Sequence, residues 1–471
     1  MAKKPQKHES NGAAKPGDRQ APASCYILSL SVENVRCFGP KQTLDFTDGK
    51  GNPAQWTIIL GENGTGKTTL LQILTSFELL PKSGMIDSKD PKSYSPRIFL
   101  YPILLPPPLY PTAPVSISDH QVYSGLPRGD SNNRAVSKLV FRPLDGLRAG
   151  ASSSVPFDAE WHIDSHCAQG RFGNISPVYN AYGVGRRLRG VLLSQSEKDD
   201  PVATLFDDTV PLRNAVDWLL RLDYAAKSTK LPADAARVEQ VKHLLISILP
   251  DIGDLRFQTT SGPNPRQWVE FQTFSGWVPL RRLGYGYQTL VAWVLDFVSR
   301  MVERYPNSPD PLKEPAIVIV DEIDLHLHPA WQRKLIAFLT ERFTNTQFIV
   351  TAHSPLIVQA VEDANVVVLK RVGDHVEIIN DVDEVRGWRV DQILTSNLFG
   401  LTSARPPGVE KLFARKEELI NKRHLTVREQ HELKRLQEKI DRVPVGDSAA
   451  SVKEFDAIRN ALDLLMKNSP P

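Results

Sequence analysis

The chain has 471 residues, a formal net charge of +3 and three cysteines. This length exceeds one ordinary hydrophobic core and predicts about three domain-sized units. The near balance of charge favours neither a nucleic-acid binder nor an enzyme for acidic substrates. Three scattered cysteines argue against a disulfide framework and are typical of the reducing cytosol. Because we find no apolar run of bilayer length and no signal peptide, we expect a cytoplasmic protein without a membrane partner.

Composition and periodicity along the chain predict its domain plan. The N-terminal segment is rich in Lys, Pro, Gly and Ala and has little to bury, which predicts a disordered tail. Two strand-like runs follow, and with the apolar run at residues 56–60 they predict a sheet edge leading into a Gly-rich loop. We expect a basic tail at 1–24, one large head at 25–385 with an irregular β-rich insertion at 78–156 and a helical lobe at 203–250, and a helical region at 386–471.

Residues 61–68 (GENGTGKT) fit the phosphate-binding pattern G-x-x-x-x-G-K-[ST] between a strand and a helix that we expect to reach Phe77. Such a loop turns its backbone N–H groups toward one anion, and the helix N-terminus adds a partial positive charge. Lys67 can reach the β- and γ-phosphates of ATP, and the Thr68 hydroxyl can ligate Mg²⁺. The expected nucleotide-binding residues are Gly61, Glu62, Asn63, Gly64, Thr65, Gly66, Lys67, Thr68 and Thr69.

The remaining pattern predicts an α/β fold with a doubly wound, mostly parallel sheet. Apolar runs at 316–320, 347–351 and 364–370 read as buried strands and alternate with helices, one of them opened by Pro329. The insertion is expected to be antiparallel β. The C-terminal region is expected to be a helical hairpin, with Thr426 starting a capping box.

Two acids end the first of these strands, because AIVIV is followed by Asp321 and Glu322. Adjacent carboxylates at the end of a dry strand are costly unless something neutralises them. Mg²⁺ held through Asp321, opposite Thr68, supplies that charge. Glu322 is then free to polarise the water that attacks the γ-phosphate. We therefore assign Thr68 and Asp321 to the metal and Glu322 to catalysis.

Histidines follow two of the expected strands. His353 ends the run at 347–351 and can donate a hydrogen bond to the γ-phosphate, so it is the second catalytic candidate; packing at a strand end is the alternative. His326 and His328 follow the acidic pair. Two histidines without a nearby cysteine are a weak zinc pattern, and a loop at a nucleotide-dependent interface is the more economical interpretation.

With LGYGYQ at residues 283–288, these motifs resemble the ABC-type ATPase heads of the SMC and RecF-like class, within the AAA family. The string from DEIDLHLHP to FIVTAHSPLIV is similar to stand-alone ATPases of bacterial anti-phage defence systems, and most of all to the ATPase subunit of the Septu system. The resemblance implies a Walker A motif at 61–68, a Walker B acid at Asp321, a catalytic base at Glu322 and a switch histidine at His353.

The same resemblance implies a signature at residues 283–288 that acts in trans, with Gly284 and Gly286 facing ATP bound to a second subunit. The chain departs from the family here, because Gly284 occupies the usual Ser position. It also lacks a clear Q-loop glutamine and has Arg186 and Arg187 instead. These arginines are interpreted either as a substitute γ-phosphate sensor or as surface charges that join two lobes.

We therefore expect an ATPase that forms a homo-oligomer around ATP and controls a separate effector, an HNH-type nuclease, in phage defence. One alternative is a DNA-repair ATPase that binds DNA directly, although no long heptad run supports an SMC role. A second is the nucleotide-binding subunit of a transporter. A third is an ATPase fused to a nuclease, but the region after residue 386 shows no strand-plus-acid pattern and is shorter than a usual domain.

Overall fold

The computed structural model of the chain describes twelve stretches. They are residues 25–75, 79–81, 94–96, 136–143, 157–162, 167–170, 179–186, 200–249, 251–261, 267–361, 363–380 and 387–443. The expected tail at 1–24, most of the insertion at 78–156 and Arg187 lie outside these residues. The chain divides into two compact units, residues 1–393 and 394–471.

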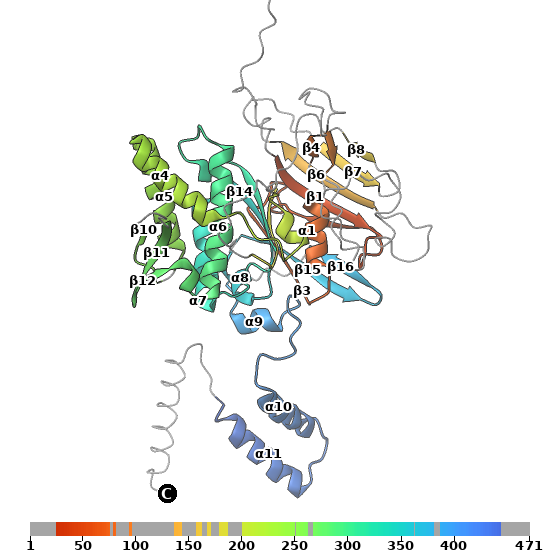
Figure 1. The fold of residues 1–471 in the computed structure, drawn as a ribbon. Coiled ribbons are helices and arrows are strands. Elements are labelled where there is room, and N and C mark those ends of the chain that lie inside the picture. The colour runs from red at the N-terminus through yellow and green to blue at the C-terminus, as the bar shows by residue number, and fades with distance from the viewer. Residues whose placement is uncertain are drawn as a thin grey trace, which may run out of the picture. The chain divides into compact units, whose positions relative to one another are not determined.

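A six-stranded sheet forms the centre of the first unit (Figure 1). Its order is β16-β15-β3-β14-β13-β9, and every neighbouring pair is parallel except β15 and β16. The strands are β3 (Trp56–Gly61), β9 (Tyr179–Tyr182), β13 (Ala316–Val320), β14 (Thr346–Thr351), β15 (Asn365–Val372) and β16 (His375–Ile379). The predicted fold class, α/β with a mostly parallel sheet, is confirmed.

The interior strands of this sheet read as continuous apolar runs because both of their faces are covered. All residues of β14 and the first five of β3 are buried. Strand β14 lies between β3 and β13. Consequently, the end of β14 separates the Gly-rich loop after β3 from the acidic pair after β13.

The first two strands are not part of this sheet, which corrects the prediction that they form an edge beside the P-loop strand. They belong to a five-stranded antiparallel sheet of order β2-β1-β6-β7-β8. Its members are β1 (Cys25–Glu33), β2 (Gln42–Asp45), β6 (Val136–Pro143), β7 (Phe157–His162) and β8 (Cys167–Gly170). Buried and half-buried residues largely alternate along β1, as in a sheet with one covered face. The described parts of the insertion also include a short hairpin, β4 (Leu79–Pro81) with β5 (Tyr94–Pro96).

Helix α1 (Lys67–Thr75) packs into the apolar core that joins the two sheets (Figure 1). Leu70, Leu71 and Leu74 are at most 1% exposed and meet Leu30 of β1 and Ile349 of β14 in one cluster. The helix is described as far as Thr75, and its predicted end at Phe77 lies outside the described residues. The core therefore fixes the direction in which the N-terminus of α1 points.

Aromatic side chains form a second core, between the central sheet and helices α6 (Tyr285–Arg304) and α7 (Pro329–Arg342). Trp56 stacks on Phe348 at 4.3 Å between ring centroids. Phe343 contacts both Phe348 and Phe297 of α6. Twelve of the twenty residues of α6 are buried, so this helix is held along its length.

The predicted helical lobe contains α3 (Ala203–Phe206), α4 (Ala215–Thr229) and α5 (Pro232–Ile248). A three-stranded antiparallel sheet follows, made of β10 (Leu255–Thr259), β11 (Gln267–Thr273) and β12 (Gly276–Pro279). The 3₁₀ turn η4 (Leu280–Arg282) then leads into α6. Two short elements complete the unit, η5 (Pro311–Lys313) before β13 and α8 (Pro355–Ala360) after β14.

Helix α9 (Val390–Thr395) reaches into the second unit, where α10 (Pro407–Ile420) and α11 (Val427–Ile440) form a hairpin. The predicted capping box is confirmed: Glu429 N donates to Thr426 Oγ1 at 3.3 Å, and Thr426 N donates to the Glu429 carboxylate at 2.9 Å. Only Leu419 and Leu436 are buried in these two helices. No helix in the described part of the chain is both long and apolar enough to cross a membrane.

Candidate nucleotide-binding site

The Gly-rich loop connects β3 to α1 and takes the backbone conformation that its glycines allow. Gly64 and Gly66 have φ angles of 80° and 85°, in the left-handed region that other residues avoid. A Cβ on Gly66 would lie 2.5 Å from the Cys37 sulfur, whereas one on Gly64 would meet nothing within 4 Å. The loop thus needs glycine at 66 for both conformation and space, and at 64 for conformation alone.

The Lys67 ammonium lies inside this loop. Its Nζ donates to the carbonyl oxygens of Gly61 and Glu62, at 2.8 and 3.0 Å. The residue is only 7% exposed. Burial lowers the pKa of Lys67, while the charges of Asp321, Glu322 and Asp324 oppose that shift. The P-loop and the acids after β13 are therefore close enough to interact electrostatically.

The two predicted metal ligands are in direct contact. Thr68 Oγ1 donates to Asp321 Oδ2 at 2.6 Å. The other Asp321 oxygen accepts from Thr351 Oγ1 at 2.5 Å, at the end of the intervening strand β14. A hydroxyl and a carboxylate are the oxygen ligands that Mg²⁺ prefers. The described residues include no cluster of three or more His, Cys, Asp or Glu side chains that could hold a metal, so these two ligands would need phosphate and water oxygens to complete a shell.

Glu322 follows Asp321 in a strained conformation, with a φ of 48°. Its backbone N–H donates to Thr351 Oγ1 at 2.7 Å. Its carbonyl accepts from Arg186 at 2.8 Å, and the Asp321 carbonyl accepts from the same guanidinium at 3.0 Å. Left-handed backbone at a non-glycine residue costs about 1–3 kcal/mol and persists only where neighbours enforce it. Arg186 and Thr351 are those neighbours.

Arg186 is thus a buried residue and not the surface charge that one interpretation of the sequence expected. It is 3% exposed. Burial lowers the pKa of Arg186 to about 10, against the opposing charges of Asp321, Glu322 and Asp324. Its guanidinium is bonded to two backbone carbonyls, which is a structural use of the charge. The alternative role as a γ-phosphate sensor stays a prediction.

His353 is beside the predicted catalytic base. Its Nε2 lies 3.9 Å from Glu322 Oε1, and its backbone N–H donates to the Asp324 carboxylate at 3.2 Å. Both side chains are about one-third exposed, at 38% for His353 and 32% for Glu322. The structure therefore brings the predicted base and the predicted switch histidine to one partly open edge of the sheet.

The predicted signature begins α6 and packs on the loop after the acidic pair. Gly284 is the N-cap of α6 and supplies no side-chain cap. A Cβ on Gly286 would lie 2.4 Å from the carbonyl oxygen of His326. Tyr285 meets the His326 ring edge-on at 4.8 Å, and Tyr287 meets Trp331 at 4.2 Å. Signature and loop therefore form one packed corner within the same chain.

The two loop histidines have structural roles at this corner. His328 is the N-cap of α7, and its Nδ1 accepts from Ala330 N at 3.3 Å. His326 has a φ of 64° and packs against Tyr285. The side chain of Gln332 on α7 also contacts this loop, because its Nε2 donates to the Leu327 carbonyl at 3.2 Å.

Reasoning from the sequence missed Thr351 and Arg36 at this site. Arg36 has a φ of 50°, and its guanidinium donates to Thr69 Oγ1 in the first turn of α1 at 3.2 Å. Burial lowers the pKa of this arginine. A cation at a helix N-terminus is unfavourable unless an anion is present, which suits a nucleotide site. Its place three residues after Glu33, the last residue of the first strand, is the one signal in the sequence that could have pointed to it.

Two family models match the chain: "AAA domain, putative AbiEii toxin, Type IV TA system" over residues 186–359, and "AAA domain" over residues 29–78. Both matched segments contribute residues to the site described above. The chain is thus similar to AAA-type domains in both segments, in agreement with the P-loop geometry of the site.

Among curated relatives, "Septu protein PtuA" of Bacillus mycoides (strain KBAB4) is 26% identical over 453 residues, covering 94% of this chain and 55% of that protein. "Retron Ec83 probable ATPase" of Escherichia coli is 31% identical over 183 residues, covering 39% of this chain and 32% of that protein. The chain thus spans about half the length, or less, of these relatives. The predicted resemblance to AAA-type ATPases of bacterial defence systems is confirmed.

Among solved structures, the "SmcHead bound to the C-winged helix domain of ScpA" aligns with a TM-score of 0.41 and 12% identity, covering 75% of this chain and 97% of that one. A likeness of this size carries no argument about function.

Proposed function

We propose that this chain is an ATPase that binds ATP with Mg²⁺ and hydrolyses it to ADP and phosphate. The observation that carries the proposal is the 2.6 Å hydrogen bond between Thr68 and Asp321. Thr68 belongs to the P-loop after β3, whereas Asp321 follows β13, which is two strands away in the sheet. This contact supports the proposal that the phosphate-binding loop and the carboxylate share one ion site. It is the arrangement that phosphoryl transfer needs, because positioning and charge neutralisation supply most of its catalysis.

The chain's own residues divide the work of binding. The N–H groups of residues 61–69 would surround the β- and γ-phosphates, and Lys67 would exchange the carbonyls of Gly61 and Glu62 for phosphate oxygens. Arg36 would extend the cationic surface next to Thr69. Bound Mg²⁺ would supply charge neutralisation between the phosphates, Thr68 and Asp321.

Glu322 is proposed as the general base that orients water and takes its proton. Arg186 and Thr351 hold its backbone, while its side chain stays partly exposed and free to meet a water. His353, 3.9 Å away, would donate to the γ-phosphate. These roles account for why a strained backbone is retained at position 322.

A homo-oligomer would complete the site, because the signature is proposed to cap ATP held by a second subunit. The N-terminus of α6 has no side-chain cap at Gly284 and offers a partial positive charge for that contact. Gly284 leaves this end open, since no side chain caps it.

Gly284→Asp tests the trans site more cleanly than a change at Gly286. A Cβ on Gly286 would collide with His326 of its own chain, whereas one on Gly284 meets only Tyr287, at an ordinary 3.7 Å. Asp is a favoured N-cap residue, so it should preserve or stabilise α6. It should nevertheless repel the partner's γ-phosphate. Gly284→Asn is the matched neutral control.

Each single variant, Gly284→Asp or Lys67→Ala, should lose most ATPase activity. A mixture should regain some, because an exchanged dimer pairs one intact P-loop with one intact signature. Gly284→Asn should stay close to wild type. If subunit exchange is demonstrated and the mixture remains as inactive as its components, the shared-site proposal is wrong.

The biological role is proposed from the relatives. Their names refer to Septu and retron systems, so we infer a role in anti-phage defence in which ATP controls a separate effector of the HNH-nuclease type. The α10–α11 hairpin is the proposed docking element. A capping box begins its second helix, and Ile420 and Val427 near its turn are 56% and 70% exposed.

A further inference from the structure

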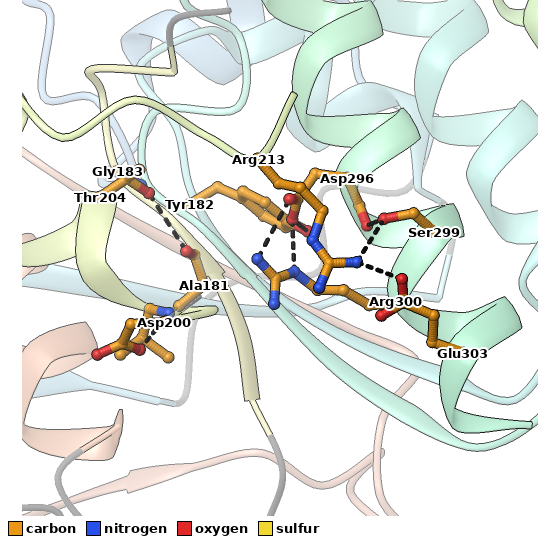
Figure 2. Close-up of polar contacts among 11 residues, drawn as sticks. Ala181, Tyr182, Gly183, Asp200, Thr204, Arg213, Asp296, Ser299, Arg300 and Glu303 are labelled. Carbon is orange, nitrogen blue, oxygen red and sulfur yellow. Dashed lines mark hydrogen bonds and ion pairs between the residues drawn. The ribbon is translucent and has the colours of Figure 1, made fainter. Parts of the chain in front are cut away.

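A buried carboxylate lies outside the nucleotide site, in the middle of the signature helix. Asp296 of α6 is fully buried, at 0% exposure. Its Oδ2 accepts from Tyr182 Oη at 2.8 Å and from Arg300 Nε at 2.7 Å, and its Oδ1 accepts from another Arg300 nitrogen at 3.2 Å (Figure 2). The carboxylate therefore joins two partners, one on its own helix and one on the central sheet.

Stability alone explains this cluster poorly. The free energy needed to remove two charged side chains from water is about as large as the free energy gained from their attraction. Apolar side chains of similar volume are therefore often equally stable in such a place. Arg300 lies on α6 itself, so Asp296 keeps this charge partner wherever the helix lies, and the bond from Tyr182 Oη is the contact of this cluster that ties α6 to β9. Its effect is to fix where α6 lies along β9.

The sheet end of the cluster adjoins the catalytic acids. Tyr182 is the last residue of β9, and its carbonyl oxygen accepts from Asp321 N at 2.8 Å. The other end of the cluster, Asp296, lies on the helix that begins with the signature. At a rise of 1.5 Å per residue, Gly286 of the signature is about 15 Å from Asp296 along the axis of α6. One hydroxyl–carboxylate contact thus connects the strand beside Asp321 with the helix that carries the signature.

Neighbouring residues hold the β9 end in place. Gly183 N donates to Thr204 Oγ1 at 3.2 Å, and Thr204 Oγ1 donates to the Ala181 carbonyl at 3.4 Å (Figure 2). A Cβ on Gly183 would lie 1.9 Å from the Thr204 carbonyl oxygen. Trp293 of α6 also packs on Tyr182, with 5.6 Å between ring centroids. The strand end is therefore a fixed anchor for α6.

We propose that Tyr182 and Asp296 are positioning residues that set the register of the signature helix against the catalytic strand, and so aim the signature at ATP on the partner subunit. This inference rests on the proposed trans-acting site. It predicts that loss of the contact impairs the partner's active site and leaves the variant's own P-loop and acids competent.

Tyr182→Phe is the test variant. It removes one hydroxyl, keeps the ring that packs on Trp293, and leaves the Asp296–Arg300 ion pair intact. We expect kcat to fall about tenfold, which corresponds to a signature displaced by a fraction of an ångström. The ATP dissociation constant measured by calorimetry should stay within about twofold, since the P-loop is unchanged.

Glu303→Gln is the matched control on the same helix. Glu303 is 53% exposed and pairs with Arg213 at 2.8 Å (Figure 2), and Arg213 precedes α4. This variant loosens an ion pair between α6 and the helical lobe and leaves the contact with β9 intact. Its kcat should match the wild type. A loss equal to that of Tyr182→Phe would show that any weakened α6 contact suffices, and would overturn the specific role of the Asp296 cluster.

Mixing subunits decides whether the defect acts in trans. Tyr182→Phe chains mixed with Lys67→Ala chains form dimers whose one intact P-loop is served by the wild-type signature of the Lys67→Ala chain. That site should turn over at the wild-type rate per active site. If it keeps the tenfold defect, Tyr182 acts on its own acid pair through Asp321 N, and the proposal is wrong.

The proposed function and this inference can fail separately. If Gly284→Asp has no effect on the ATPase, the trans site itself is wrong. If Gly284→Asp inactivates the enzyme while Tyr182→Phe equals the wild type, only the positioning role fails. Asp296→Asn supplies a second variant: if it folds, its loss of kcat should equal or exceed that of Tyr182→Phe, and full activity would contradict the inference.

Discussion

Thr351 shows how one small side chain organises the catalytic corner. It is completely buried, and its hydroxyl donates to Asp321 while accepting from the N–H of Glu322. Thr351 can reach both acids because it ends β14, which lies between the P-loop strand β3 and the strand β13 that the acids follow. The hydroxyl therefore fixes both the carboxylate that would face the metal and the backbone of the proposed base.

We predict that Thr351→Val destabilises the head by about 1–3 kcal/mol, because Asp321 loses a donor and Glu322 N loses its acceptor. Valine keeps the shape of the side chain but cannot make either bond. Urea unfolding followed by tryptophan fluorescence measures the free energy of unfolding, and steady-state hydrolysis should fall in parallel.

Thr351→Ser is the control for this prediction, since it keeps the hydroxyl and removes only a methyl group. Serine should retain most of the ATPase activity. Equal ATPase rates for valine and serine would show that the hydroxyl has no part in ordering the acids.

At the level of residues, motif spacing predicted where the phosphate loop, the acids and His353 would be, because each follows a strand of the same sheet. Spacing could not predict Thr351, nor the bonds of Arg186 to the backbone of the acids, because these partners are 30 and about 135 residues away. Long-range hydrogen bonds depend on strand order, and no local pattern reports that order.

Helix α11 provides a pH-sensitive test at the scale of one element. Hydrogen bonds from Lys422, and then from Thr426, lower the pKa of Glu429 from 4.5 to about 2. A carboxyl whose pKa is depressed on folding stabilises the folded form above its unfolded value. That contribution is lost as the pH falls through the folded value. The start of α11 should therefore weaken between about pH 4.5 and pH 2.

Hydrogen exchange of the first-turn amides of α11 measures this effect, with protection factors corrected for intrinsic exchange. Glu429→Gln should remove most of the pH dependence in that window. Glu438→Gln, a change at an exposed acid later in the same helix, should leave it unchanged. Identical profiles for wild type and Glu429→Gln would rule out the capping box as the source.

Most helices and strands could be predicted, because hydrophobic periodicity and the residues that begin or end an element are local features of the sequence. Helix α11 was predicted from its capping box, and β13 from its run of apolar residues. The sheet assignment of β1 and β2 was wrong, because adjacency along the chain suggested adjacency to β3. Besides β2, β1 pairs with β6, more than 100 residues later, and local sequence patterns do not reveal such long-range pairing.

At the scale of the whole molecule, three described acids follow one strand, because Asp321, Glu322 and Asp324 come after β13. The described residues contain no cluster of three or more side chains that could hold a metal. A two-metal nuclease needs carboxylates that converge on a pocket of their own. Nuclease activity is accordingly proposed for a separate effector.

We therefore predict that the purified chain leaves supercoiled and linear DNA intact with Mg²⁺ or Mn²⁺, with and without ATP. Gel electrophoresis after long incubation is the measurement. Cleavage that disappears in Asp321→Ala but persists in Lys67→Ala would identify this chain as the nuclease instead of the regulator.

The chain divides into two compact units after residue 393, and composition predicted that the helical C-terminal region begins at 386. A boundary depends on which contacts the chain forms, and composition changes only gradually there. The proposed need for a second subunit rests on a motif that is expected to act on ATP bound to another chain.

The central claim is that Lys67 grips ATP while Glu322 activates water, at one site. Calorimetric titration with ATP and Mg²⁺, paired with phosphate release, tests it on Lys67→Ala and Glu322→Gln. We predict that Lys67→Ala shows no measurable ATP binding, whereas Glu322→Gln binds ATP about as tightly as wild type and turns over at least about 100-fold more slowly. Wild-type ATP affinity in Lys67→Ala, or undiminished turnover in Glu322→Gln, would contradict the account.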